Sequence, residues 1–193
     1  MAPTPVLAIC GSLRSDSLHR AVLRAIEARA YGLQLLGAEL VPQLPLLNPD
    51  LDTPDRMPTA VREFRLLAEA CQGAIIASPE YVNAPSGVTK NALDWLVGST
   101  GLYAKPVLLI SASPGQTGGI RGLAALVPTL LAMDATLVDP VSISHAAGRI
   151  LPDGEVRDAG LDLRLDIALE QLTEAMAVSA ATAPAGSGRG TGR

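Results

Sequence analysis

The chain has 193 residues, a net charge of −4, 48% hydrophobic residues and a mean hydropathy of +0.30. This length and apolar content are typical of one domain with a sizeable core. The acidic balance argues against a general nucleic-acid or membrane-surface binder, because both need broad basic patches.

The two cysteines, Cys10 and Cys71, form neither a disulfide framework nor a metal-binding spacing. We expect both to be buried free thiols, and we assign no metal ligand. The N-terminal MAPTP lacks the basic region of a signal peptide, and no segment reaches about 18 uninterrupted apolar residues. We therefore expect a cytoplasmic location and no membrane partner.

The first informative stretch is an apolar run, Val6 to Cys10, that stops at Gly11. Such a run predicts a strand covered on both faces. The loop that follows contains Ser12, Arg14 and Ser17 and leads directly into a helical pattern. Free N–H groups at a helix N-terminus, hydroxyl donors and a guanidinium are typical of a phosphate site.

A simpler interpretation of this loop is that one serine caps the helix and Arg14 is a solvated charge. Capping accounts for one hydroxyl but not for three serines and an arginine within six residues, so we favour a phosphate site. The loop lacks the lysine of a Walker A motif and the three glycines of a dinucleotide fingerprint. We therefore expect a mononucleotide phosphate as the ligand.

The next part of the chain alternates between predicted elements and connections. A covering helix begins at Leu18, and Ala38 to Val41 predicts a short strand that Pro42 stops, which favours an edge position. The proline-rich segment from Gln43 to Pro58 is interpreted as a long surface connection. A second amphipathic helix begins at Thr59.

Two further buried strands are predicted from Gly73 to Ser78 and from Pro106 to Ala112. The first opens into a turn and a third helix within Pro79 to Trp95. The second opens into the glycine-rich segment from Ser113 to Gly119, which favours close backbone approach to a ligand. Pro128 should kink the helix that follows.

The last predicted strand, Thr136 to Ile143, contains Pro140 and should lie at the other edge. A final helix covers Leu161 to Met176. From Val178 the composition cannot bury apolar area, so we expect one domain over residues 1–177 and a disordered tail over 178–193.

Five strands alternating with helices predict an α/β fold: a doubly wound, five-stranded parallel sheet with helices on both faces. The edge positions favour the strand order 2-1-3-4-5. In such sheets ligands lie beyond the carboxyl ends of the strands, at the switch point between strands one and three. The three unusual loops all lie at that end.

In the same order, the segments GSLRSDS, PEYVNAPSGVTKNALDW and SASPGQTGGIRG resemble the NADPH-dependent FMN reductase family of quinone, azo-dye and chromate reductases. The resemblance covers about residues 5–145. It implies a flavodoxin-like fold, bound FMN, and NADPH or NADH as co-substrate.

The resemblance also implies three groups of FMN contacts. The phosphate would be held by the side chains of Ser12, Arg14 and Ser17 and by the backbone of Leu18 and His19. The isoalloxazine would be lined by Pro79, Glu80, Tyr81 and Val82. Its other edge would be approached by Ser113, Pro114 and Gly115.

Three positions depart from the family pattern: many relatives have asparagine where this chain has His19 and Val82, and proline where it has Ser86. A valine side chain cannot donate to the flavin, so contact there would need a backbone N–H. His19 could instead be a polar helix residue near solvent. The apolar helix from Val88 to Val97 is expected to contribute to a homodimer, and whether dimers pair into tetramers stays open.

The main functional hypothesis is an oxidoreductase that passes hydride from nicotinamide through FMN to a small acceptor. The cofactor carries that chemistry, so we assign no catalytic side chain. One alternative is a flavodoxin-like electron carrier with a protein partner. Another is a phosphate-binding module that has lost flavin.

Overall fold

The computed structural model describes residues 2–29 and 32–182. Its main sheet has the order β2-β1-β3-β6-β7, and β8 also pairs with β6. The strands are β1 (Thr4–Cys10), β2 (Leu33–Leu36), β3 (Gly73–Ala77), β6 (Pro106–Ala112), β7 (Thr136–Leu137) and β8 (Val141–Ile143). All pairings are parallel, which confirms the doubly wound fold and its strand order.

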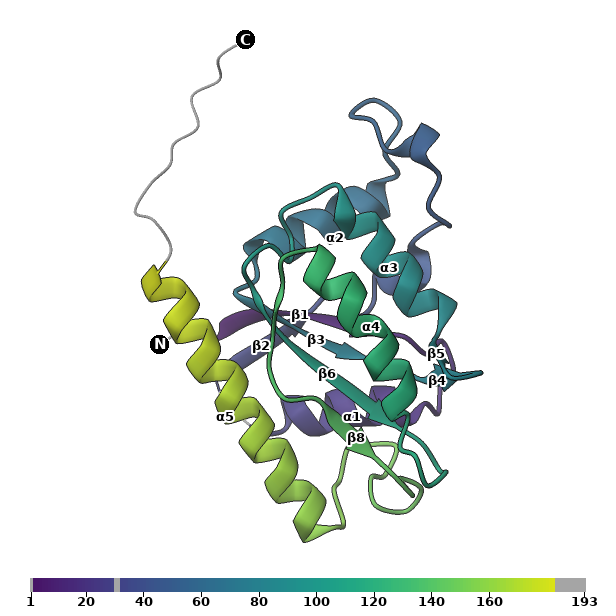
Figure 1. Cartoon of the computed structure of the whole chain (residues 1–193), viewed down its shortest axis with the longest axis vertical. Helices are drawn as coiled ribbons and strands as arrows, with labels where there is room; N and C mark the ends of the chain where they lie inside the picture. The colour runs from purple at the N-terminus through teal and green to yellow at the C-terminus, as the bar shows by residue number, and fades with distance from the viewer. Residues whose placement is uncertain (1, 30–31, 183–193) are drawn as a thin grey trace.

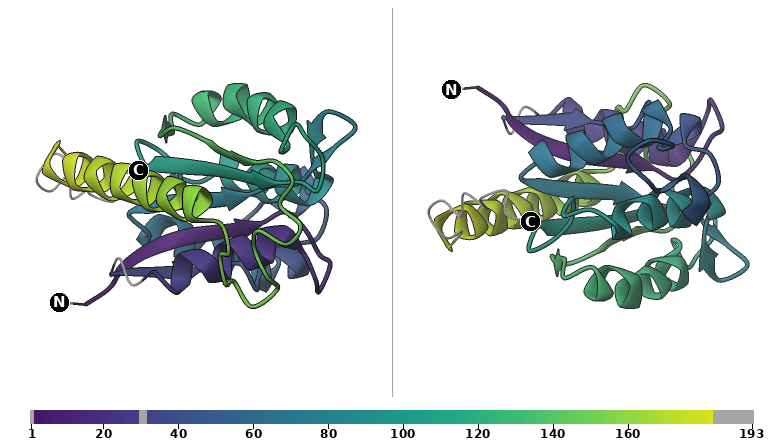
Figure 2. Two further views of the ribbon diagram at one scale, coloured as in Figure 1. Left: turned by 90° about the horizontal axis from the view of Figure 1, so that it is seen from below. Right: turned by 90° about the horizontal axis from the view of Figure 1, so that it is seen from above.

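Helices cover both faces of the sheet (Figures 1 and 2). One face packs against α1 (Leu18–Glu27) and α5 (Ala159–Thr182). The other packs against α2 (Thr59–Ala70), α3 (Gly87–Val97) and α4 (Ile120–Ala132). The apolar strands are buried because both of their faces are covered.

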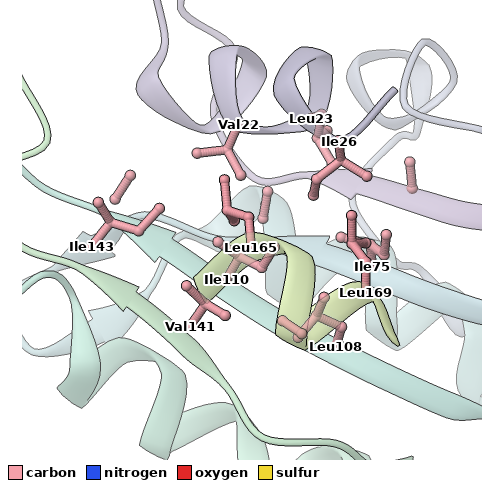
Figure 3. Packing of buried hydrophobic residues seen from close by; sticks show 14 of the residues in the cluster. Val22, Leu23, Ile26, Ile75, Leu108, Ile110, Val141, Ile143, Leu165 and Leu169 are labelled. Atoms are coloured by element: carbon pink, nitrogen blue, oxygen red, sulfur yellow. The ribbon is translucent and has the colours of Figure 1, made fainter. Parts of the chain in front are cut away.

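Figure 3 shows the core between the sheet, α1 and α5. Val22 and Ile26 of α1, Ile75 of β3, and Leu165 and Leu169 of α5 all belong to this core, and all five are buried. Burial of such side chains contributes about 1.5–3 kcal/mol each. This packing fixes the start of α1 against the sheet, and hence the loop that precedes it.

The predicted second strand was wrong: the strand is Leu33–Leu36, and residues 38–40 form a turn that leads into a short 3-10 helix at Val41–Gln43. Gly37 ends the strand in the left-handed region, at a φ of 96°. Leu40 and Val41 are apolar because they fill the core beside α2 and α3, not because they pair in the sheet.

The segment from Gln43 to Pro58 runs over the surface but is held at both ends. The carbonyl oxygen of Pro45 accepts hydrogen bonds from Asn91 Nδ2 and Trp95 Nε1, at 2.9 and 2.7 Å. A second 3-10 helix lies at Pro49–Leu51. Beyond it, Asp52 pairs with the buried Arg65 at 2.6 Å, and this guanidinium holds the pKa of the Asp52 carboxyl below its usual value.

Two other boundaries differ from the sequence prediction. The last strand is split into β7 and β8, with Pro140 just before the second piece, because proline cannot donate to the ladder. α5 continues to Thr182, so residues 178–182, predicted as part of a disordered tail, are helical. The rest of that predicted tail, 183–193, lies outside the described residues. α4 is one helix that contains Pro128.

Candidate functional site

Three loops meet beyond the carboxyl ends of β1, β3 and β6, and they enclose a pocket of about 190 Å³. Ten of the twelve predicted contact residues line it, together with Asp16 and Ala112; the ten are Ser12, Arg14, Ser17, Leu18, His19, Pro79, Glu80, Tyr81, Ser113 and Pro114. Val82 and Gly115 are not among the lining residues. The structure therefore brings segments about 70 and 100 residues apart in sequence into one site.

The first loop and α1 form the anion-binding side of this pocket. Ser17 is the N-cap of α1, and its Oγ accepts from the His19 N–H at 3.2 Å. The Ser17 hydroxyl proton is left free to donate to an anion. Ser12 is buried and Arg14 is exposed, and both line the pocket beside the start of α1, so a hydroxyl and a guanidinium accompany the helix end.

The His19 side chain points into the protein instead of toward solvent, so the alternative of a solvent-facing histidine was wrong. Its Nε2 accepts from the Ala112 N–H at 3.2 Å, and its ring is 5% exposed. Burial lowers the His19 pKa to about 4, although a hydrogen bond to the Ser78 backbone acts in the opposite direction. A neutral His19 thus ties α1 to the ends of β3 and β6.

The second loop forms a two-residue hairpin between β4 (Glu80–Tyr81) and β5 (Ala84–Pro85). Its turn residues, Val82 and Asn83, have φ values of 53° and 60°, the pattern of a type I′ turn. A β-branched residue is rarely found there, so Val82 holds strained backbone. Val82 is 97% exposed. The hairpin of β4 and β5 projects from the edge of the molecule in Figure 1.

Two contacts fix this hairpin to the start of α4. The Glu80 carboxylate accepts from the Gly122 N–H at 2.9 Å, and Arg121 Nη1 donates to Asn83 Oδ1 at 2.9 Å. A carboxylate at a helix N-terminus is stabilised by the helix dipole. Glu80 is therefore engaged with α4, while the exposed Tyr81 ring is the aromatic group beside the pocket.

The third loop is tied to the chain that follows β8. The Ser113 carbonyl accepts from the Ala146 N–H at 2.9 Å, and the Gly115 carbonyl accepts from the His145 N–H at 3.0 Å. The Gly115 N–H is itself bound to Ser113 Oγ at 3.0 Å. These bonds hold the backbone of the loop, whose Ser113 and Pro114 line the pocket.

A larger hollow, of about 800 Å³, is lined by residues at the start of β6 and the C-terminal part of α5. Figure 2 shows how α5 runs along the sheet. The walls of the hollow include Tyr103, Lys105, Met176 and Val178. The pKa of Lys105 is lowered by burial, and its Nζ donates to the Ala68 and Glu69 carbonyls at the end of α2. The smaller pocket is the better candidate, because it lies at the switch point and contains helix-end donors.

One feature next to the pocket was not predicted from the sequence. A buried row of hydroxyls, Ser78, Ser86 and Thr89, lies directly behind the loops. Single serines and threonines carry no periodic signal, so the sequence offered only Ser86, as a departure from the family. Among the described residues no cluster of three or more metal-ligating side chains occurs, and no helix is long and apolar enough to cross a membrane.

Comparisons with known proteins agree with this geometry. A probable NADPH:quinone oxidoreductase of Oryza sativa is 37% identical over 122 residues, which are 61% of this chain and 60% of that protein. An NAD(P)H-dependent FMN reductase of Pseudomonas aeruginosa is 34% identical over 158 residues, 79% of this chain and 84% of that protein. The chain thus spans only about three fifths of the plant relative's length.

The solved structure of the flavoenzyme NAD(P)H:(acceptor) oxidoreductase from Paracoccus denitrificans has a TM-score of 0.77 to this fold at 27% identity, covering 89% of this chain and 98% of that one. The family model described as NADPH-dependent FMN reductase matches residues 4–148, which contain all three loops. This chain belongs to the NADPH-dependent FMN reductase family.

Proposed function

We propose that this chain is an NAD(P)H-dependent flavin oxidoreductase that binds FMN in the pocket formed by the three loops. The observation that carries the proposal is the convergence of the predicted phosphate and ring contacts on one pocket, in a chain of the FMN reductase family. The geometry suits FMN because a capped helix end with free donors faces a loop that carries an exposed tyrosine.

The parts of the pocket have separate tasks in this proposal. Ser12, Arg14 and Ser17 bind the phosphate, helped by the N-terminal backbone of α1 at Leu18 and His19. Pro79, Glu80 and Tyr81 would lie along the flavin ring, with Val82 outside the lining residues. The loop from Ser113 to Gly115 would approach the ring's other edge through Ser113 and Pro114. Bound FMN supplies the redox chemistry, accepting a hydride from NADPH or NADH and passing two electrons to a small acceptor.

The acceptor is proposed to be a quinone or another small oxidant, on the strength of the activity named for the Oryza relative. The chain itself contributes binding and orientation, and we assign no side chain to proton transfer. Two buried free cysteines are compatible with the reducing cytoplasm, which we retain as the proposed location.

α3 offers fewer exposed apolar side chains for the proposed homodimer interface than the sequence suggested. Most apolar side chains of α3 are buried within the chain, and Val97 is the large exposed one, at 64%. Leu46 is 82% exposed on the segment that Asn91 of α3 holds through the Leu47 N–H. Light scattering tests the dimer: we expect twice the chain mass for the parent, and less for Leu46→Asp if this face is the interface.

The flavin proposal is tested with the purified protein. We expect it to be yellow, to release FMN on denaturation, and to lose its visible absorbance when mixed anaerobically with NADPH or NADH. Colourless protein that does not take up added FMN would favour the phosphate-module alternative. Flavin-loaded protein that neither nucleotide bleaches would favour the electron carrier.

A further inference from the structure

A buried chain of hydroxyl groups connects the phosphate loop to the hairpin loop behind the pocket. Ser86 Oγ donates to the Gly11 carbonyl at 2.7 Å and lies 3.0 Å from Thr89 Oγ1. Thr89 Oγ1 lies 2.9 Å from Ser78 Oγ, which donates to the Pro79 carbonyl at 3.2 Å. Gly11 precedes the phosphate loop and Pro79 begins the hairpin loop, so this row of hydroxyl groups connects the two loops.

The number of hydroxyl protons shows how Thr89 differs from the two serines. Three hydroxyl protons serve four contacts, and the carbonyls at the two ends can only accept. Ser86 therefore donates to Gly11, and Ser78 donates to Pro79. The Thr89 hydroxyl donates to Ser78 Oγ, and the Thr89 backbone N–H donates to Ser86 Oγ at 3.1 Å. Thr89 therefore links the two serines without being needed to satisfy either carbonyl.

Thr89 lies in a tightly packed region between the two loops. Thr89 is fully buried, and Ser78 and Ser86 are 1% and 3% exposed. A Cβ on Gly11 would lie 2.0 Å from Thr89 Oγ1 and 3.0 Å from the Pro79 ring, so the first loop touches both α3 and the second loop. Water cannot replace a lost hydroxyl without displacing these atoms.

We propose that Thr89 is a positioning residue that fixes the flavin-ring loop relative to the phosphate loop and thereby sets the preference for FMN over riboflavin. The inference rests on the proposed binding of FMN in this pocket. FMN engages both loops, whereas riboflavin lacks the phosphate and engages the hairpin loop without the first. A flexible connection between the loops should therefore weaken FMN more than riboflavin.

The test compares dissociation constants of FMN and riboflavin for four proteins. Thr89→Val keeps the side-chain shape and removes the hydroxyl, and we expect it to lower the FMN preference by roughly three- to tenfold, the value of one hydrogen bond. Thr89→Ser retains the hydroxyl, so its preference for FMN over riboflavin should stay within about twofold of the parent's. Thr173→Val is the matched control, because Thr173 bonds only its own helix, at Leu169.

The visible spectrum of bound flavin gives a second readout, which should shift in Thr89→Val and not in the control. Folded Thr89→Val with the parent's preference and spectrum would overturn the inference. If Thr89→Val does not fold, Ser78→Ala breaks the same connection from the other side and must lower the preference. Failure of both variants to fold, while Thr89→Ser folds, would show a purely structural role and also overturn it.

These outcomes are separable from those that bear on the proposed function. A parent protein that binds neither flavin overturns the proposed function and this inference with it. A parent that prefers FMN, combined with an unchanged Thr89→Val, overturns the positioning role alone.

Discussion

His19 Nε2 accepts a hydrogen bond from the Ala112 N–H at 3.2 Å, across 93 residues of sequence. Because a protonated imidazole cannot accept, this bond requires neutral His19. Burial and this bond agree with the lowered pKa of about 4. The start of α1 and the end of β6 therefore share one contact that is sensitive to protonation.

The pH dependence of stability follows from this pKa. Below its ordinary value of 6.5, His19 takes up a proton in the unfolded chain, while in the folded chain it stays neutral down to about 4. The contribution of His19 is therefore fully present above pH 6.5 and is lost as the pH falls toward 4. We expect the free energy of unfolding to be about 2 kcal/mol lower at pH 5 than at pH 7.5 from this group.

Urea unfolding of the parent and His19→Gln at both pH values measures this contribution. Glutamine can accept from the Ala112 N–H but does not titrate. Between pH 7.5 and pH 5, His19→Gln should therefore lose about 2 kcal/mol less free energy of unfolding than the parent. His145→Gln is the control, because His145 is exposed. Equal pH dependence in the parent and His19→Gln would contradict the assignment.

Arg14 should distinguish the phosphate side of the pocket from the ring side. We expect Arg14→Ala to weaken FMN by about one to two decades and to leave riboflavin nearly unchanged, because a charge-assisted hydrogen bond to phosphate contributes about 1.5–3 kcal/mol. Arg62, whose guanidinium donates to the Pro54 carbonyl and which does not line the pocket, provides the control substitution. Fluorescence titration measures both ligands, and equal losses for the two would exclude the role.

Gly119 should be intolerant of any side chain. Its φ is 85°, and an added Cβ would lie 2.0 Å from Ser111 Oγ. We expect Gly119→Ala to cost about 3 kcal/mol or more, since backbone strain and overpacking add. Gly148 has a similar φ of 79° with nothing within 4 Å, so Gly148→Ala isolates the strain, at about 1 kcal/mol. Similar losses of melting temperature in Gly119→Ala and Gly148→Ala would show that the neighbouring atoms move enough to remove the steric clash with Ser111.

Parts of this fold could be predicted because their signals are local. The unbroken apolar runs at β1, β3 and β6 can be satisfied only by burial on both faces, and the polar turn at Ser17 ends at a capped helix. β2 was misplaced because its residues alternate weakly and the apolar Leu40 and Val41 nearby pack on helices. No local pattern separates those two uses of an apolar side chain.

The site was predictable to the level of its loops but not of its side-chain contacts. The three loops follow strand ends, so topology alone places them together. Glu80 lines the pocket, but the sequence did not indicate that its carboxylate bonds the start of α4; His19, considered near solvent as an alternative, is buried. Both outcomes depend on residues 42 and 93 positions away, which only the folded chain reveals.

The reductase proposal predicts a particular kinetic pattern because the pocket offers few aromatic rings. Among the described residues that line it, Tyr81 is the one Phe, Tyr or Trp, so one face of a bound flavin ring should lack a stacked side chain. Hydride transfer needs the nicotinamide within about 3–3.5 Å of the ring, which such an open face permits.

If nicotinamide and acceptor use that face in turn, initial-rate plots at varied NADPH and quinone should be parallel. Replacing Tyr81 by alanine should keep the lines parallel, because the order of binding depends on the shared face and not on the tyrosine. Intersecting lines in the parent would show that both substrates are bound at once. The acceptor would then need a binding site separate from that of the nicotinamide, and the proposal that both use one open face of the flavin would be wrong.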